Sequence, residues 1–389
     1  MDKIPCSDKI KILWFITPFQ PRYGVMNIVM GWAEKVDYSK FDITLACYTP
    51  DEKELLEKFS KFPNIKIILF SSLSQIKYLF IPQFIELDNF FSKNKFDVIH
   101  TIFVQADIIG AILKRKYKIP IHVSSIMGQI ISSVNGSIFI QKCKRYLYNF
   151  MYRKFCNNID CYFPITSTSS KQLLLEFGIK AKKIVVIYSG VPLDIRNKKK
   201  RSNSSFIIGA ASQLIYEKGI DILIQALPEI KKLHPNVTLI IAGEGQEKNK
   251  LLDLAKTLDV TNNIQFLGFC KDMPEFMNSL DLFVFPARPS YDGLPRVILE
   301  AMVQHTPVIA SNTDEIREIL TLNSRNGILF EIENVQSLVS GIKEMFISDE
   351  NVDFITDCAF KTATSITVEE NIKLIQNTYV DLLDYKKLI

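Results

Sequence analysis

The 389-residue sequence lacks the features that mark several large classes of protein. It contains no run of about eighteen uninterrupted apolar residues, the length that a membrane-spanning helix requires, so we expect no transmembrane segment. Its seven cysteines form no Cys-x-x-Cys pair and histidine occurs only four times, which argues against a zinc site and a disulfide framework. Such cysteine usage is typical of the reducing cytoplasm.

The composition is that of a globular protein, with 47% hydrophobic and 23% charged residues. A chain of this length is long for one core, so we expect two domains of about 190 residues each. The first apolar stretch, residues 9–16, is too short and too charged for a signal peptide and predicts a strand.

Charge is distributed unevenly along the chain, although the net charge is only +5. Residues 1–190 contain 26 Lys and Arg against 15 Asp and Glu, whereas residues 202–389 contain 16 against 26. The basic N-terminal half therefore predicts an anionic partner for that half.

Short apolar runs alternate with helical patterns in both halves, which predicts an α/β fold with two doubly wound parallel sheets. The expected strands are residues 10–17, 41–48, 65–70, 96–103, 119–126, 159–165 and 184–188, then 206–210, 237–242, 264–267, 282–285, 307–310 and 328–330. Polar residues 194–204 separate the two series and predict a linker. We expect an N-terminal domain over residues 1–193 and a C-terminal domain over residues 205–369.

Residues 281–310 predict a strand, a loop, a helix and a second strand. A loop that enters a helix at the carboxyl end of a parallel strand favours an anion such as phosphate. Asp292 in the loop and Glu300 in the helix flank this position. Two carboxylates around an anion site suit a nucleotide sugar, whose diphosphate lies between hydroxylated rings. The alternative is that two acidic residues flank an exposed helix by chance.

Residues 289–310, PSYDGLPRVILEAMVQHTPVIA, resemble the donor-site signature of the family 4 retaining glycosyltransferases, the glycosyl transferases group 1. That family has two glutamates at the spacing of Asp292 and Glu300. The resemblance implies the GT-B fold, in which two Rossmann-like domains face each other across a cleft. It also implies that the last helix, about residues 370–389, joins the N-terminal domain.

The resemblance further implies transfer of a sugar from a nucleotide-sugar donor to a saccharide or lipid-linked saccharide acceptor. Glu300 would bind the ribose hydroxyls, and Asp292, a catalytic candidate, would bind the hydroxyls of the transferred sugar. Lys218, the second catalytic candidate, would contact the diphosphate. The remaining expected donor-binding residues are Gly24, Gln213, Gly293 and Leu294.

Two positions depart from the family's pattern. Gln213 stands where the family normally has Arg, which removes a charge beside the diphosphate, and Arg22 and Arg288 are candidate replacements. Met127 stands where many members have His beside the reacting sugar. His100 matches a position that is often His, and it is either an acceptor-side residue or a structural histidine. His100 and Met127 are thus the acceptor-side candidates.

No Asp-x-Asp motif, the metal site of the other major glycosyltransferase fold, occurs in the sequence. We therefore expect no metal and no cofactor, and retention of configuration through attack on the donor's same face. Two alternatives stay open. The first is a non-catalytic scaffold or partner protein of the GT-B fold, which Asp292, Gln213 and Met127 favour. The second is another enzyme of that fold, such as a nucleotide-sugar epimerase or a phosphorylase.

Residues 137–158 interleave basic and aromatic residues on a predicted helix, and residues 114–118 add four cations. This pattern favours an anionic membrane surface, with rings at the interface and cations near headgroups. The alternative is that the aromatic residues face the core while the cations are solvated. Nucleic acid is not an expected partner, because no recognition module accompanies the charge. The expected setting is surface polysaccharide synthesis in the cytoplasm, at the inner face of the membrane.

Overall fold

The structure is a computed structural model, and the residues that it describes are 9–16, 24–47, 52–70, 81–127, 146, 150, 152–178, 184–197, 205–289, 293–320 and 325–388. The chain divides into two compact units. Unit 1 consists of Met1–Gly190 and Val368–Ile389, and unit 2 of Val191–Thr367. The last helix thus belongs to the same unit as the N-terminal residues, and unit 2 begins three residues before the expected linker.

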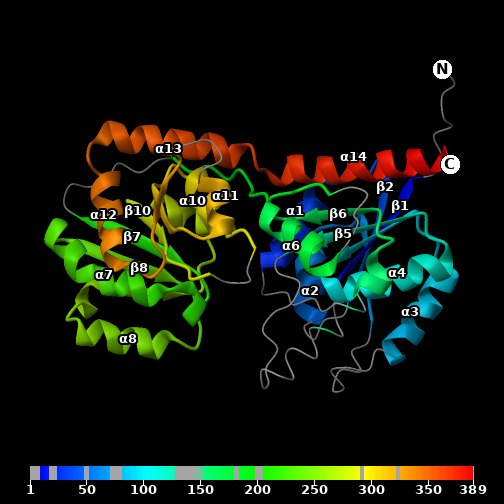
Figure 1. Ribbon diagram of the computed structural model, residues 1–389, viewed down its shortest axis with the longest axis horizontal. Coiled ribbons are helices and arrows are strands. Elements are labelled where there is room, and N and C mark those ends of the chain that lie inside the picture. Colours follow the sequence, from blue (N-terminus) through cyan, green and yellow to red (C-terminus); the bar gives the residue numbers. More distant parts are fainter. Residues whose placement is uncertain are drawn as a thin grey trace. The chain divides into compact units, whose positions relative to one another are not determined.

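Six parallel strands form the sheet of unit 1 in the order β3-β2-β1-β4-β5-β6 (Figure 1). They are β1 (Ile10–Ile16), β2 (Phe41–Cys47), β3 (Ile65–Leu69), β4 (Val98–Ile102), β5 (Ile121–Ile126) and β6 (Cys161–Pro164). The expected seventh strand at residues 184–188 is wrong. Ile184 forms a bridge to Tyr162, and the amides of Val185 and Ile187 donate to the carbonyl oxygens of Tyr162 and Pro164 at 3.0 and 2.9 Å. The ladder does not continue, because Pro164 has no N–H to donate in return.

Alternating side chains of β1 serve the two faces of this sheet, as strand geometry requires. Ile12 and Trp14 pack in the cluster that includes α1, α2 and α14, whereas Leu13 and Phe15 pack with α3 and α4. The helices of unit 1 are α1 (Gly24–Lys35), α2 (Glu52–Phe59), α3 (Ile81–Lys93), α4 (Val104–Tyr117), α6 (Ser167–Phe177) and α14 (Val368–Lys387). Both faces are covered, so the strands are buried, and β4 and β5 also bury polar side chains, among them His100, Thr101, His122, Ser124 and Ser125.

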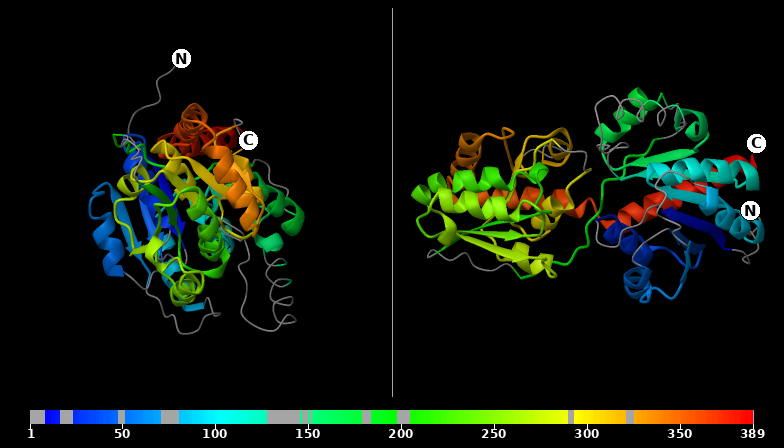
Figure 2. Two further views of the ribbon diagram at one scale, coloured as in Figure 1. Left: turned by 90° about the vertical axis from the view of Figure 1, so that its left-hand side faces the viewer. Right: turned by 90° about the horizontal axis from the view of Figure 1, so that it is seen from below.

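Unit 2 contains a second parallel sheet, in the order β12-β11-β10-β7-β8-β9. Its strands are β7 (Phe206–Ala211), β8 (Val237–Ala242), β9 (Ile264–Gly268), β10 (Leu282–Phe285), β11 (Val308–Ser311) and β12 (Ile328–Phe330). Its helices are η1 (Tyr216–Lys218), α7 (Ile220–Leu233), α8 (Lys248–Thr257), η2 (Thr261–Asn263), α9 (Met273–Asn278), α10 (Arg296–Val303), α11 (Asp314–Leu320), α12 (Val335–Met345) and α13 (Asp349–Thr364). Helices lie on both faces of each sheet (Figure 2).

Both sheets therefore have the doubly wound Rossmann strand order. In each sheet the order reverses beside the first strand, between β1 and β4 in unit 1 and between β7 and β10 in unit 2. The crevice outside the carboxyl ends of these strands is where such sheets bind ligands. None of the helices in the described ranges is both long enough and apolar enough to cross a bilayer.

We predict that α14 is essential for the stability of unit 1. Ile372 is 1% exposed in the core of unit 1, and Leu374 on the same helix is 42% exposed. Ile372→Ala should lower the free energy of unfolding by about 2–5 kcal/mol, and Leu374→Ala by less than about 0.5 kcal/mol. Urea unfolding followed by tryptophan fluorescence measures this directly, because both tryptophans of the chain, Trp14 and Trp32, lie in unit 1. An unshifted transition in Ile372→Ala would contradict the prediction.

Candidate functional site

The carboxyl edge of the unit 2 sheet brings several of the predicted donor residues to one place. β7 and β10 pair in parallel, with Ile208 beside Leu282, so both strands end at this edge. Gln213 and Lys218 follow β7, and the segment from Gly293 to Glu300 follows β10. The strand order reverses between these two strands, so this edge is the expected ligand crevice of unit 2.

Lys218 is held at the end of β10 by the turn that it closes. Gly219, the next residue, has φ +65°, and a Cβ atom there would lie 1.9 Å from the carbonyl oxygen of Pro286. A residue with a side chain could not make this close approach. The ammonium nitrogen of Lys218 lies 5.8 Å from the centre of the Phe285 ring. Lys218 is therefore positioned beside the carboxyl end of β10.

Arg288 clamps this turn and is not a spare cation for an anionic ligand. Its guanidinium donates to both carboxylate oxygens of Asp221, at 2.9 and 2.7 Å, and to Glu333 at 2.5 Å. It also donates to the carbonyl oxygen of Tyr216 at 2.6 Å and lies 3.9 Å from the centre of that ring. Two carboxylates thus offset its one charge. Of the two suggested replacements for the charge missing at Gln213, Arg22 lies outside the described residues.

Glu300 lies on the first turns of α10 beside a cation that the sequence reasoning missed. Its carboxylate is 3.8 Å from the guanidinium of Arg296, and the side chains are 23% and 14% exposed. Burial raises the pKa of Glu300, while the charge of Arg296 opposes the rise. Arg296 Nε is buried and has no hydrogen-bond partner among the residues that the structure describes. The spacing of four residues between these opposite charges was the signal that could have revealed the pair.

The loop after β9 reaches the same edge. Burial is the main cause of a raised pKa of the Cys270 thiol, and the charges of Asp272 and Glu300 add to the rise. Leu294 is 5% exposed, so its side chain belongs to the core and only its backbone is left for a ligand. Asp292 lies outside the described residues, and its role stays a prediction.

In unit 1 the structure places His100 beneath the surface. It is 0% exposed, its Nδ1 lies 2.5 Å from the hydroxyl of Tyr379, and its Nε2 lies 2.7 Å from Ser125 Oγ. Its ring stacks on Trp32. Burial lowers the pKa of His100 to about 3. This is the geometry of a structural histidine, which ties β4 to β5 and α14.

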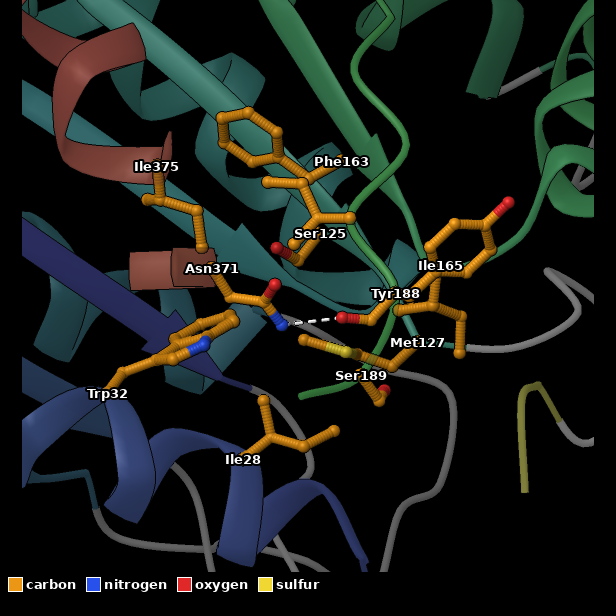
Figure 3. A pocket seen from close by; sticks show the side chains of 11 residues that line it. Ile28, Trp32, Ser125, Met127, Phe163, Ile165, Tyr188, Ser189, Asn371 and Ile375 are labelled. Carbon is orange, nitrogen blue, oxygen red and sulfur yellow. Dashed lines mark hydrogen bonds between the residues drawn. The ribbon is translucent and has the colours of Figure 1, made fainter. Parts of the chain in front are cut away.

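Met127 lies at the carboxyl edge of the unit 1 sheet, where β5 ends. It lines a recess of about 10 Å³, the room that about one water molecule needs. Its thioether points toward Trp32 and Asn371 (Figure 3). The Asn371 amide donates to the carbonyl oxygen of Tyr188 at 2.5 Å and so joins α14 to this recess. Gly24, the last of the predicted donor residues, is the first residue of α1, which follows β1 at the same edge.

Comparison with known proteins identifies relatives over most of the chain. The family described as "Glycosyltransferase Family 4" matches residues 24–195, and the family described as "Glycosyl transferases group 1" matches residues 193–356. An uncharacterized glycosyltransferase of Haemophilus influenzae is 26% identical over 206 residues, and the match covers 51% of this chain and 58% of that protein. The chain thus spans less than two thirds of the length of this relative.

Two further relatives match almost the whole chain. The UDP-Gal:alpha-D-GlcNAc-diphosphoundecaprenol alpha-1,3-galactosyltransferase of Escherichia coli is 23% identical over 385 residues, which are 92% of this chain and 94% of that protein. The crystal structure of Anabaena Alr3699/HepE in complex with UDP superposes with a TM-score of 0.76 at 22% identity, over 96% of this chain and 100% of that chain. At this identity the structural likeness shows the fold alone.

We predict that His100 makes unit 1 less stable in acid. A histidine whose pKa is about 3 when folded and about 6.5 when unfolded binds fewer protons in the folded state, so its stabilising effect is present above pH 6.5 and is lost as the pH falls. At pH 5 the loss is about 2 kcal/mol. His100→Gln removes this titration, so the difference in unfolding free energy between wild type and variant should narrow by about that amount from pH 7 to pH 5. Urea unfolding followed by tryptophan fluorescence measures it. A constant difference would show that His100 is not buried in the neutral form.

Proposed function

The chain belongs to the glycosyl transferases group 1 of glycosyltransferase family 4, which have the GT-B fold, and on that premise we propose that it transfers a sugar from a nucleotide-sugar donor to a saccharide or lipid-linked saccharide acceptor. The observation that carries the proposal is the edge where the unit 2 strand order reverses. There Lys218 follows β7, and Glu300 follows β10. A cation and a half-buried carboxylate at such an edge suit a diphosphate with a ribose attached.

In the proposed donor complex each residue has one task. Glu300 accepts hydrogen bonds from the ribose hydroxyls, and Lys218 donates to the diphosphate. The backbone amides of Gly293 and Leu294 approach the phosphates, and Asp292 holds the hydroxyls of the transferred sugar. Glu300 suits its task because burial and Arg296 fix its position, while its carboxylate keeps part of its surface exposed.

Retention of configuration without a metal ion is part of the proposal. Departure of the nucleoside diphosphate leaves negative charge on a phosphate oxygen, which Lys218 and the positive end of α10 stabilise. The acceptor hydroxyl attacks the sugar from the face that the phosphate leaves and passes its proton to that phosphate. The lack of an Asp-x-Asp motif supports the part of the proposal that needs no metal ion. Gln213 adds a hydrogen bond without a charge.

The relatives suggest which substrates to test first. The name of the Escherichia coli relative gives UDP-Gal as donor and a diphosphoundecaprenol-linked sugar as acceptor. The Anabaena relative has also been crystallised with UDP-glucose. We therefore propose a uridine donor, a lipid-linked acceptor and a role in surface polysaccharide synthesis. A cytoplasmic location stays a prediction from the cysteine usage, and the inner face of the membrane one from the basic and aromatic residues of the N-terminal half.

Release of UDP from UDP-hexoses, measured with and without polyprenyl-diphosphate saccharides, distinguishes the alternatives. A transferase releases UDP in step with acceptor consumption and leaves the anomeric configuration unchanged. Conversion of the donor without an acceptor would indicate an epimerase, and dependence on inorganic phosphate a phosphorylase. UDP binding with no turnover of any donor would indicate a non-catalytic scaffold.

The first prediction of this proposal concerns Glu300. Glu300→Ala should weaken UDP binding about 10- to 100-fold, the effect of losing hydrogen bonds between hydroxyls and a charged group. Isothermal titration calorimetry with UDP measures this. The matched control is Glu344→Ala, which removes an exposed glutamate from α12 and should leave the affinity unchanged. Equal affinities for wild type and Glu300→Ala would rule out the ribose role.

The second prediction concerns the pair of Arg296 and Glu300. The charge of Arg296 opposes the effect of burial on the pKa of Glu300, so Arg296→Leu should raise that pKa further. Because ribose binding uses the ionised carboxylate, UDP affinity should fall on acidification at a higher pH in Arg296→Leu than in wild type. Arg296→Lys keeps the charge and should retain more of the wild-type profile. Calorimetry from pH 8 to pH 5 measures the profiles, and identical profiles for all three proteins would contradict the prediction.

A further inference from the structure

A second site in unit 1 lies at the opposite edge of its sheet from the candidate acceptor residues. It is a recess of about 960 Å³ between the C-terminus of α4 and the residues that precede β6. Its charged lining consists of Lys114, Arg115, Lys116, Lys118, Lys154 and Lys386, with one carboxylate, Asp160. These residues lie at the amino ends of β5 and β6, whereas Met127 lies at the carboxyl end of β5. The recess is therefore separate from the predicted acceptor region.

The single carboxylate of the recess is already shared between two lysines. Lys114 donates to Asp160 at 2.5 Å, Lys386 lies 3.1 Å from the other oxygen, and the amide of His122 donates at 2.8 Å. The two ammonium groups carry one charge more than Asp160 neutralises. Burial and the nearby charge of Lys386 lower the pKa of Lys114, although the interactions with Asp160 oppose this. Asp160 thus organises the floor of the recess without cancelling its positive charge.

The remaining cations face the solvent. Lys116 pairs with Asp88, which lies outside the recess lining. Arg115, Lys118 and Lys154 are exposed and form no ion pair with any residue in the described ranges. The C-terminus of α4 adds about half a negative charge, which is small against the excess of cations in the lining. The recess therefore attracts anions.

Exposed aromatic side chains lie in the same chain segment as the recess. Tyr146 and Phe150 are helical residues that are 78% and 54% exposed. They precede Lys154, a cation of the recess lining, by eight and four residues. Exposed rings beside flexible cations are the combination that suits the boundary between lipid headgroups and acyl chains. A small soluble anion would gain no binding energy from these exposed rings.

We propose that this basic recess, together with the exposed rings of Tyr146 and Phe150, docks unit 1 on an anionic lipid bilayer, with a phospholipid phosphate in the recess. The docking itself does not depend on transferase activity.

Sedimentation with lipid vesicles tests the docking on the full chain. The probes are phosphatidylcholine vesicles, alone and with about one third phosphatidylglycerol, at low and high salt. The test variant is Arg115→Gln/Lys118→Gln/Lys154→Gln. The matched control, Lys231→Gln/Lys343→Gln/Lys361→Gln, removes three exposed cations from unit 2. Since each cation near an anionic surface contributes a factor of about five, the test variant should bind about 100-fold more weakly, and the control within about twofold of wild type.

A second pair of variants tests the contribution of an exposed aromatic ring. Phe150→Ala should weaken binding to the anionic vesicles, whereas Phe354→Ala, which removes a ring of similar exposure from unit 2, should not. Equal loss in the two triple variants, or equal binding to neutral and anionic vesicles, would overturn the docking proposal. Binding of tripolyphosphate in calorimetry without vesicle binding would overturn it in favour of a soluble ligand. UDP titration of the test variant should match wild type, so failure of this proposal and failure of the transferase proposal are distinguishable.

Discussion

Parallel pairing of β7 with β10 is the constraint on which the candidate donor site depends. Because both strands run the same way, the segments that follow them leave the sheet at one edge, although they are more than seventy residues apart in the sequence. The backbone contact between Gly219 and Pro286 and the clamp by Arg288 then fix the turn of Lys218 against the end of β10. A cation and a carboxylate from separate strand-to-helix segments are thereby held at one ligand crevice.

The positive charge that a ligand meets at this edge depends on how far each arginine is already neutralised by carboxylates. Arg288 binds Asp221 and Glu333, so it adds little net charge to the crevice. Its role is to hold the turn that contains Lys218. Arg296 faces a single carboxylate, Glu300, and keeps one buried nitrogen without a partner in the described part of the chain. Gln213 stands in place of a family arginine, and Lys218 and Arg296 are the cations that the described residues supply at the ends of β7 and β10.

Apolar runs predicted the strands well, while contacts distant in sequence could not be predicted. Residues 237–242, 282–285 and 328–330 match β8, β10 and β12 residue for residue, because strands with helices on both faces are mostly apolar. Residues 184–188 are equally apolar, but they lie beside β6 at Pro164, which has no N–H to continue the ladder. The partners of Arg288 lie 67 and 45 residues away, and the Tyr379 partner of His100 lies 279 residues away, so no local pattern reports them.

In unit 1 part of the excess of basic residues is concentrated at one place. A basic N-terminal half could have meant cations spread evenly over its surface, or cations beside the substrate. The structure instead gathers six of them in a recess at the amino edge of the sheet, where Asp160 holds Lys114 and Lys386 together. Like charges are kept this close only at a cost in mutual repulsion, which the fold offsets with one buried carboxylate and the C-terminus of α4. An anionic surface lowers this repulsion. It would therefore bind the recess more strongly than it would bind the same cations spread evenly over the protein, because the clustered cations contact the surface together.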